Sequence, residues 1–159
     1  MKVYFDLDGV LRDLCTPTLG YEPEEWHHVT EKGESIIDIL ERDLCIFAKA
    51  PPTEYFEYIV ENHTPICIIT NQKEHWKPYT WQWLHDNFGD IPFEVFYYKP
   101  EEKLQFVGEN YIVEDYPFFK NYDNVILVDR LYNKKSKAKM RVKNIKELDR
   151  ILKGLNGNK

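Results

Sequence analysis

Apolar runs along the chain alternate with segments in which apolar residues recur at helical spacing. The strand-like runs cover residues 2–7, 65–70, 93–98, 110–115, 124–129 and 140–142. Helical patterns cover residues 51–62, 74–88, 100–108 and 145–155. Runs that are apolar throughout are typical of strands buried on both faces, and their alternation with helices indicates a parallel sheet. The pattern therefore predicts an α/β fold with helices on both faces of the sheet.

Residues 14–50 interrupt this alternation directly after the first strand. Prolines and glycines divide the segment into short helical stretches, one of which, 33–47, has apolar residues at helical spacing. We expect Pro51 and Pro52 to begin the helix that follows, because proline is tolerated in a first helical turn. The chain has 159 residues, enough for one domain with a sizeable core. We therefore expect a single domain, 1–159, with a small helical insertion at 14–50.

Polar residues follow the predicted strands at the point where each strand ends. The first strand ends in "DLDG", where one residue separates Asp6 from Asp8 and Gly9 permits a turn. The strand-end residues further along the chain are Thr70, Lys99, Glu114, Asp115 and Asp129. Parallel sheets bind ligands at the carboxyl ends of their strands, so these residues predict one site. Taken alone, an Asp-Gly pair after a strand is also an ordinary turn.

The two aspartates after the first strand suit phosphoryl chemistry. A carboxylate can attack phosphorus to form an aspartyl phosphate, and a second carboxylate can protonate the leaving oxygen and later activate water. Repulsion between these acids and a phosphate dianion calls for a cation, and Mg2+ prefers carboxylate and carbonyl oxygens. Asp6 and Asp115 could supply carboxylates to Mg2+, and Asp8 could supply its backbone carbonyl.

Three further residues could contact the phosphate. Thr70 offers a hydroxyl and Asn71 offers an amide to phosphate oxygens. Lys99 offers a point charge that would neutralise the phosphate and hold Asp6 in place. Lys99 closes a strand and precedes a proline, so it is the preferred lysine. Lys103, one helical turn further on, is the alternative.

Four motifs in this order resemble the signature of the haloacid dehalogenase (HAD) superfamily of phosphatases. They are "DLDGV", a strand ending in Thr70, a lysine, and the pair Glu114-Asp115. Within the superfamily the chain is most similar to the small cytosolic 5'(3')-deoxyribonucleotidases, through "DLDGVLRD", "WLHDNFG" and "LVDRLYNK". The resemblance covers nearly the whole chain. The chain departs from it at Glu114 and Asn71, where these nucleotidases favour aspartate and serine.

The resemblance implies a Rossmann-like core and a role for each matching residue. Asp6 would be the nucleophile, and Asp8 would be the general acid and base. Thr70 would bind phosphate, and Lys99 would stabilise charge. The implied Mg2+ site consists of Asp6, Asp8, Glu114 and Asp115.

Residues 14–50 occupy the position at which this superfamily inserts a small helical cap. A cap excludes water from the phosphoryl step and selects the leaving group. We expect Trp26 and Phe47 of this segment to contact substrate, together with Gly9 and Asn71. Taken singly, each aromatic residue of the segment is better explained by packing within the cap itself.

The charge and cysteine content narrow the possible partners. The formal net charge of −6 argues against a general nucleic-acid scaffold, which needs a positive field, but allows a small phosphorylated substrate. The basic stretch 133–141 is expected to be a solvated loop, with attraction of anions as the alternative.

The three cysteines show no CxxC pairing, and the sequence shows neither a secretory signal nor an apolar run of transmembrane length. We therefore expect a cytoplasmic protein with no membrane partner and no stable nucleic-acid partner.

The sequence leaves three functions in competition. The first is a Mg2+-dependent phosphatase acting on (deoxy)nucleoside monophosphates. The second has the same chemistry but acts on a phosphosugar or on the end of a polynucleotide. The third is a receiver-type phospho-acceptor domain, which also uses carboxylates, threonine, lysine and magnesium on a parallel sheet; the order of the motifs argues against it. The sequence leaves the oligomeric state open.

Overall fold

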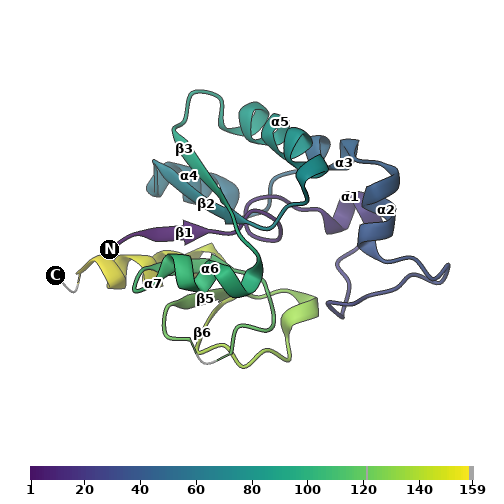
Figure 1. Cartoon of the computed structure of the whole chain (residues 1–159). Helices are drawn as coiled ribbons and strands as arrows, with labels where there is room; N and C mark the ends of the chain where they lie inside the picture. The colour runs from purple at the N-terminus through teal and green to yellow at the C-terminus, as the bar shows by residue number, and fades with distance from the viewer. Residues whose placement is uncertain (121, 158–159) are drawn as a thin grey trace.

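Within residues 1–120 and 122–157, which the computed structural model describes, six strands form one sheet. The strands are β1 (Val3–Phe5), β2 (Ile66–Thr70), β3 (Phe93–Tyr97), β4 (Tyr111–Glu114), β5 (Val125–Val128) and β6 (Met140–Val142). They lie in the order β3-β2-β1-β4-β5-β6, and each neighbouring pair is parallel. All carboxyl ends therefore reach the same edge of the sheet (Figure 1). This confirms the predicted α/β fold, and every predicted apolar run contains one strand.

Helices cover both faces of the sheet, as the apolar strands predict. The covering helices are α4 (Phe56–Asn62), α5 (Lys77–Phe88), α6 (Pro100–Val107) and α7 (Ile145–Gly157), and two short 3-10 helices are η1 (Glu74–Trp76) and η2 (Leu131–Asn133). Phe5 of β1 packs in a cluster with Trp83 of α5 and Leu148 of α7. Its neighbour Tyr4 faces the other way and packs with Val107 of α6. Among the described residues, none of the helices combines the length and hydropathy needed to cross a bilayer.

Two extended segments, residues 11–13 and 51–53, run side by side and connect the segment 14–50 to the sheet. We call these two segments the neck. The Asp13 N–H donates to the Pro51 carbonyl at 2.9 Å, and the Thr53 N–H donates to the Leu11 carbonyl at 2.9 Å. The predicted start of the next helix at Pro51 and Pro52 is therefore wrong. These prolines are part of the neck, and α4 begins only at Phe56.

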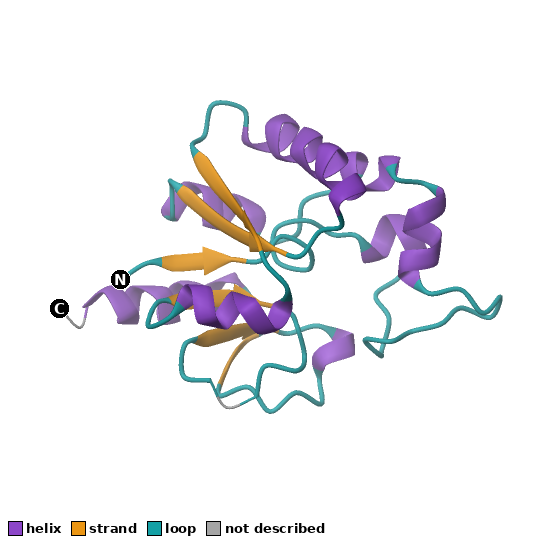
Figure 2. Cartoon of the chain, viewed as in Figure 1, coloured by secondary structure: helices purple, strands orange, loops and turns teal. Residues whose placement is uncertain are grey.

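The neck leads to three short helices beyond the carboxyl edge of the sheet. They are α1 (Cys15–Leu19), α2 (Ile36–Arg42) and α3 (Cys45–Lys49). Ser35 begins α2 with a capping box to Asp38, and the predicted helical run 33–47 is divided because α2 ends at Arg42. Figure 2 shows these helices and their loops lying apart from the strands, at the right of the view. Residues 14–50, all of which are described, contribute no strand to the sheet.

Candidate functional site

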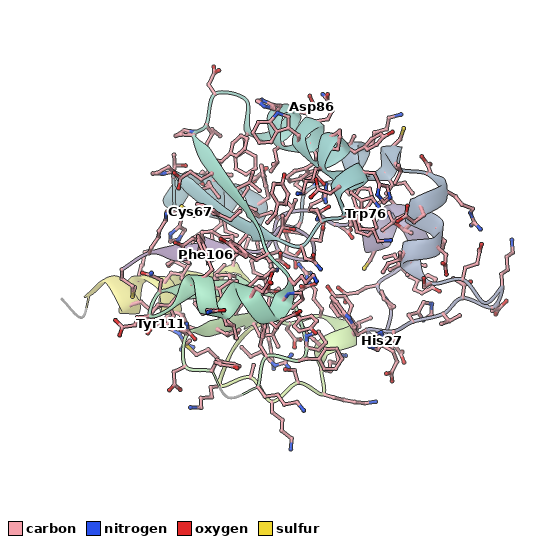
Figure 3. The ribbon with its side chains drawn as sticks, in the orientation of Figure 1. His27, Cys67, Trp76, Asp86, Phe106 and Tyr111 are labelled. Carbon is pink, nitrogen blue, oxygen red and sulfur yellow. The ribbon has the colours of Figure 1, made fainter. Side chains whose placement is uncertain are left out.

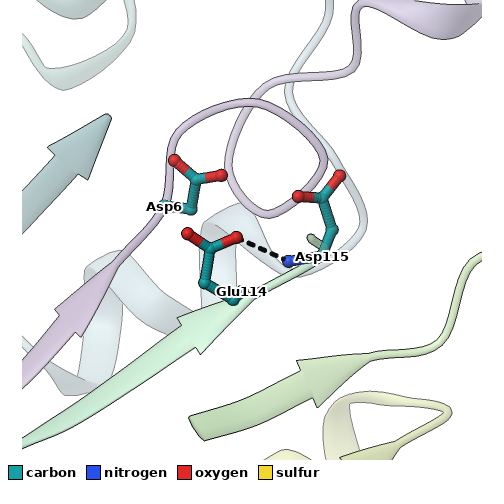
Figure 4. A group of neighbouring side chains, drawn as sticks. All are labelled: Asp6, Glu114 and Asp115. Carbon is teal, nitrogen blue, oxygen red and sulfur yellow. Dashed lines mark hydrogen bonds between the residues drawn. The ribbon is translucent and has the colours of Figure 1, made fainter. Parts of the chain in front are cut away.

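Three carboxylates meet where β1 and β4 end. These strands are neighbours, with Phe5 opposite Val113, so the residues that follow them lie side by side. The carboxylate oxygens of Asp6, Glu114 and Asp115 lie within 4.8 Å of one another, and all three side chains are buried (Figure 4). We call these three residues the acid group.

A buried lysine from α6 compensates part of the charge of the acid group. Lys103 Nζ donates to Asp6 Oδ1 at 2.8 Å and to Glu114 Oε1 at 2.6 Å. Burial lowers the pKa of Lys103, but Asp6 and Glu114 more than offset this effect and raise it above its ordinary value. The lysine is therefore held in its charged form between two carboxylates.

The preference for Lys99 over Lys103 is corrected by this geometry. Lys99 immediately precedes α6 and is exposed, and its backbone N–H donates to the Glu102 carboxylate at 3.3 Å. One turn later, position 103 faces the sheet, so a long side chain there reaches Asp6. The orientation of α6 decides which of the two lysines reaches Asp6, and the pattern of strands in the sequence does not reveal that orientation.

The environment of the acid group makes its charge costly. Burial and the nearby Glu114 carboxylate raise the pKa of Asp6, and the same two causes raise the pKa of Asp115 to about 7. Glu114 Oε2 accepts hydrogen bonds from the backbone N–H groups of Asp115 at 3.1 Å and Tyr116 at 3.2 Å. The three carboxylates form a hard-oxygen donor set, and this group could hold a divalent metal ion.

Gly9 allows the turn after β1 to approach the acid group closely. Its φ is 82°, in the left-handed region. A Cβ at this position would lie 1.9 Å from Asp115 Oδ2 and 2.8 Å from Tyr132 Oη. The Tyr132 hydroxyl in turn donates to Asp115 Oδ2. The glycine expected for the turn is thus required for a second reason, the close approach of Asp115 and of Tyr132 in η2.

The Asp8 carboxylate pairs with Arg12 and with Gln72, which follows β2, rather than with the acid group. Arg12 Nε donates to Asp8 Oδ1 at 2.6 Å, and Arg12 Nη2 donates to Oδ2 at 3.1 Å. Gln72 Nε2 donates to the same Oδ2 at 2.9 Å. We call Arg12 and Gln72 the Asp8 clamp. The Asp8 carboxylate is not part of the acid group.

Thr70 is the last residue of β2, and Asn71 follows it directly. Thr70 is buried, and its hydroxyl accepts from Gln72 Nε2 at 3.0 Å, while Asn71 is exposed. The Thr80 hydroxyl donates to Gln72 Oε1 at 3.0 Å, which ties this network to α5. Both strand-end residues lie where the sequence placed them.

A cavity of about 540 Å³ connects the strand ends to the segment 14–50. Its wall on the sheet side consists of Asp6, Asp8, Gly9, Thr70, Asn71, Lys103, Glu114 and Asp115 among others. Its opposite wall is largely apolar and includes Trp26, His27, Leu40 and Phe47, with Trp76 of η1 (Figure 3 labels His27 and Trp76). Neither Lys99 nor Asp129 is among the described residues that line it, and Asp129 instead pairs with Arg141. The structure thus brings together every strand-end residue except these two.

The two aromatic residues predicted to contact substrate differ in their surroundings. Phe47 is buried beside Trp76, with ring centroids 4.7 Å apart. Trp26 is exposed and lies edge-on to Tyr116 and Tyr132, with centroid distances of 5.4 and 5.5 Å. Both residues border the cavity. Phe47 also packs in a small cluster with Leu40 and Trp76, whereas Trp26 contacts two tyrosines outside the segment 14–50.

The sequence prediction missed four residues of the site, namely Arg12, Gln72, Thr80 and Tyr132. Arg12 carries a signal that was available, because a charged residue four positions after Asp8 is at the spacing of a side-chain pair. The others act through tertiary contacts that no spacing reveals. No family model matches this chain, and no curated protein matches it either.

Proposed function

We propose that this protein is a Mg2+-dependent phosphomonoester hydrolase of the HAD type, acting through an aspartyl phosphate on (deoxy)nucleoside monophosphates. The observation that carries the proposal is the position of Asp6. It lies on the cavity wall, contacts Lys103 at 2.8 Å, and belongs to a group of carboxylates that could hold a metal ion. The resemblance of "DLDGVLRD" to the nucleotidase motif supports the same assignment.

The proposed reaction has two steps. In the first, an Asp6 carboxylate oxygen bonds to phosphorus while the bond to the leaving oxygen breaks, and Asp8 donates its proton to that oxygen. In the second, Asp8 takes a proton from water as the water oxygen attacks phosphorus, which releases phosphate and restores the Asp6 carboxylate. Thr70 and Asn71 would bind the phosphoryl oxygens, and Lys103 would stabilise their charge.

The chemistry of the donor set fits Mg2+. Asp6 and Asp115 would hold the ion, together with the backbone carbonyl of Asp8. A bound Mg2+ would supply positive charge against the carboxylates and the phosphate dianion. Glu114 already accepts from Lys103 and from two backbone N–H groups, so we assign it to holding Lys103 beside Asp6.

The apolar wall of the cavity opposite the sheet supports the proposed substrate class. We propose that residues 14–50 act as a helical cap and that their apolar surface contacts the leaving group. Trp26 and Phe47 both border the cavity and could contact the flat face of a nucleobase. The cavity volume of about 540 Å³ lies within the usual range for small-molecule sites.

The test is phosphate release from a panel of deoxynucleoside monophosphates, with Mg2+ and with a chelator. Asp6→Asn should abolish turnover, while Asp90→Asn, an exposed aspartate, should not change it. Unchanged turnover in Asp6→Asn would exclude the mechanism. Faster turnover of phosphosugars or phosphorylated oligonucleotides would favour the second substrate class, and a stable phosphoprotein without turnover would favour the receiver function.

A further inference from the structure

We propose that Arg12 and Gln72 are positioning residues, which fix the Asp8 carboxylate at the cavity wall so that it can transfer a proton to the leaving group. This inference rests on the proposed function, in which Asp8 is the general acid and base. The carboxylate receives three hydrogen bonds, of 2.6, 3.1 and 2.9 Å, from these two residues. Its side chain nevertheless remains 28% exposed and borders the cavity.

Arg12 is itself held by two helices, α3 and α5. Its Nη1 donates to the Phe47 carbonyl at 2.8 Å and to the Thr80 hydroxyl at 3.2 Å. Its guanidinium carbon lies 5.3 Å from the Phe47 ring centroid and 5.6 Å from that of Trp83. The side chain is fully buried, so its fork has one orientation, and that orientation determines where Asp8 can pair with it.

Gln72 is held just as firmly. Its Oε1 accepts from the Thr80 hydroxyl at 3.0 Å, which leaves its Nε2 facing Asp8 and Thr70. The amide therefore donates to the proposed general acid and to the proposed phosphate ligand at once. A single side chain sets the distance between these two parts of the site.

The clamp also connects Asp8 to the segment 14–50. Arg12 lies in the neck, where it forms a bridge with Pro52, and it holds the Phe47 carbonyl of α3. The position of the Asp8 carboxylate is therefore coupled to the place where this segment returns to the sheet. Proton transfer needs the donor within hydrogen-bond reach of the leaving oxygen, so loss of this positioning should slow the step that uses the proton.

If the clamp only stabilised the fold, its loss would have a different effect. Substrates with different leaving groups distinguish this structural role from the positioning role. The 5'-oxygen of a nucleotide leaves as a strongly basic alkoxide unless it is protonated. The leaving group of p-nitrophenyl phosphate is a stable anion and needs no proton. A positioning role therefore slows formation of the aspartyl phosphate from the first ester far more than from the second, whereas partial unfolding lowers both rates equally.

The experiment compares kcat/KM for a deoxynucleoside monophosphate and for p-nitrophenyl phosphate in Gln72→Met and Arg12→Lys, because kcat/KM reports the steps up to formation of the aspartyl phosphate and omits its hydrolysis, which both esters share. We expect kcat/KM for the nucleotide to fall by about 10–100-fold, with at most about a 3-fold fall for the aryl ester. Asp8→Asn should show the same selective loss, and Gln82→Met, an exposed glutamine on α5, should show none. The ratio of the two rates does not depend on how much of a variant is folded.

Equal losses of kcat/KM for both esters, or no loss for either, would overturn the positioning role while leaving the phosphatase function intact. Absence of phosphate release from both esters in the wild-type protein would overturn the proposed function and this inference with it. A selective loss in Gln72→Met and Arg12→Lys that matches Asp8→Asn supports both.

Discussion

Asp6 and Asp8 lie two positions apart in one turn, yet they belong to opposite kinds of surroundings. Asp6 joins two other buried carboxylates, and the three have one lysine between them. Asp8 is a single carboxylate that receives hydrogen bonds from both a buried arginine and a buried amide. The acid group is thus short of positive charge, whereas Asp8 is fully paired. The comparison shows that the residues brought close by neighbouring strands determine how well the charge of each aspartate is compensated.

The largest expected effect comes from removing the charge of Lys103, which partly neutralises the acid group. Lys103→Met leaves Asp6 and Glu114 buried without their partner, and it should lower the free energy of unfolding by about 3–5 kcal/mol. Lys99→Met, the matched change at an exposed position, should alter it by no more than about 0.5 kcal/mol. Urea denaturation measures both. Equal effects of the two variants would contradict the placement of Lys103.

The next effect tests the turn that the two aspartates share. Gly9 and Gly20 have φ values of 82° and 81°, but an added Cβ meets Asp115 and Tyr132 only at Gly9. Gly20→Ala should cost about 1–2 kcal/mol from backbone strain alone. Gly9→Ala should cost about 1–3 kcal/mol more, because the acid group must move. Similar denaturation midpoints for the two variants would exclude a close approach at Gly9.

A smaller effect concerns pH and Mg2+, and it should appear at the acid group alone. The folded protein retains the Asp115 proton up to about pH 7, whereas an ordinary aspartate has a pKa of 3.8. The protonated carboxyl therefore stabilises the metal-free fold below about pH 4, and this contribution is lost as the pH rises through 7. Excess Mg2+ should offset the loss and raise Tm by several degrees, more at about pH 8 than at about pH 5.

Thermal unfolding with Mg2+ and with a chelator measures this dependence. Asp115→Asn should remove most of the Mg2+ effect, and Asp90→Asn should preserve it. An equal Mg2+ effect at both pH values would show that the ion does not compete with protons at the acid group.

The smallest effect lies outside both regions, where α2 meets η1. Glu41 accepts from Lys73 and His75 at 2.7 Å and from Trp76 Nε1 at 3.1 Å. Lys73 and His75 lower the pKa of Glu41 to about 2, so its contribution is present at neutral pH and is lost as the pH falls through that value. Glu41→Gln should reduce Tm slightly, and added salt should shrink the difference. Glu61→Gln, at another exposed position, is the control, and a reduction that is insensitive to salt would rule out the ion pairs as its cause.

The accuracy of the sequence predictions differed between strands and the residues around them. The inner strands β2, β4 and β5 are almost entirely buried and are rich in apolar residues, and the partly buried edge strands β3 and β6 still carry enough apolar residues to be recognisable. The helix at 51–62 was placed too early because proline is compatible both with a helix start and with the extended neck that Pro51 and Pro52 form. The choice of Lys99 failed for a related reason, since two lysines one helical turn apart differ only in which one faces the sheet.

The sequence by itself determined the parallel α/β fold and the set of acids at its carboxyl edge, because the period of apolar residues and the end of each strand are local properties of the chain. Only the tertiary structure decided which acids share a site. Strand order places Asp6 beside Asp115, although 109 positions separate them in the chain, and it turns Asp8 toward Arg12 and Gln72. The pairing of buried charges depends on distances between distant segments, and no local pattern contains those distances.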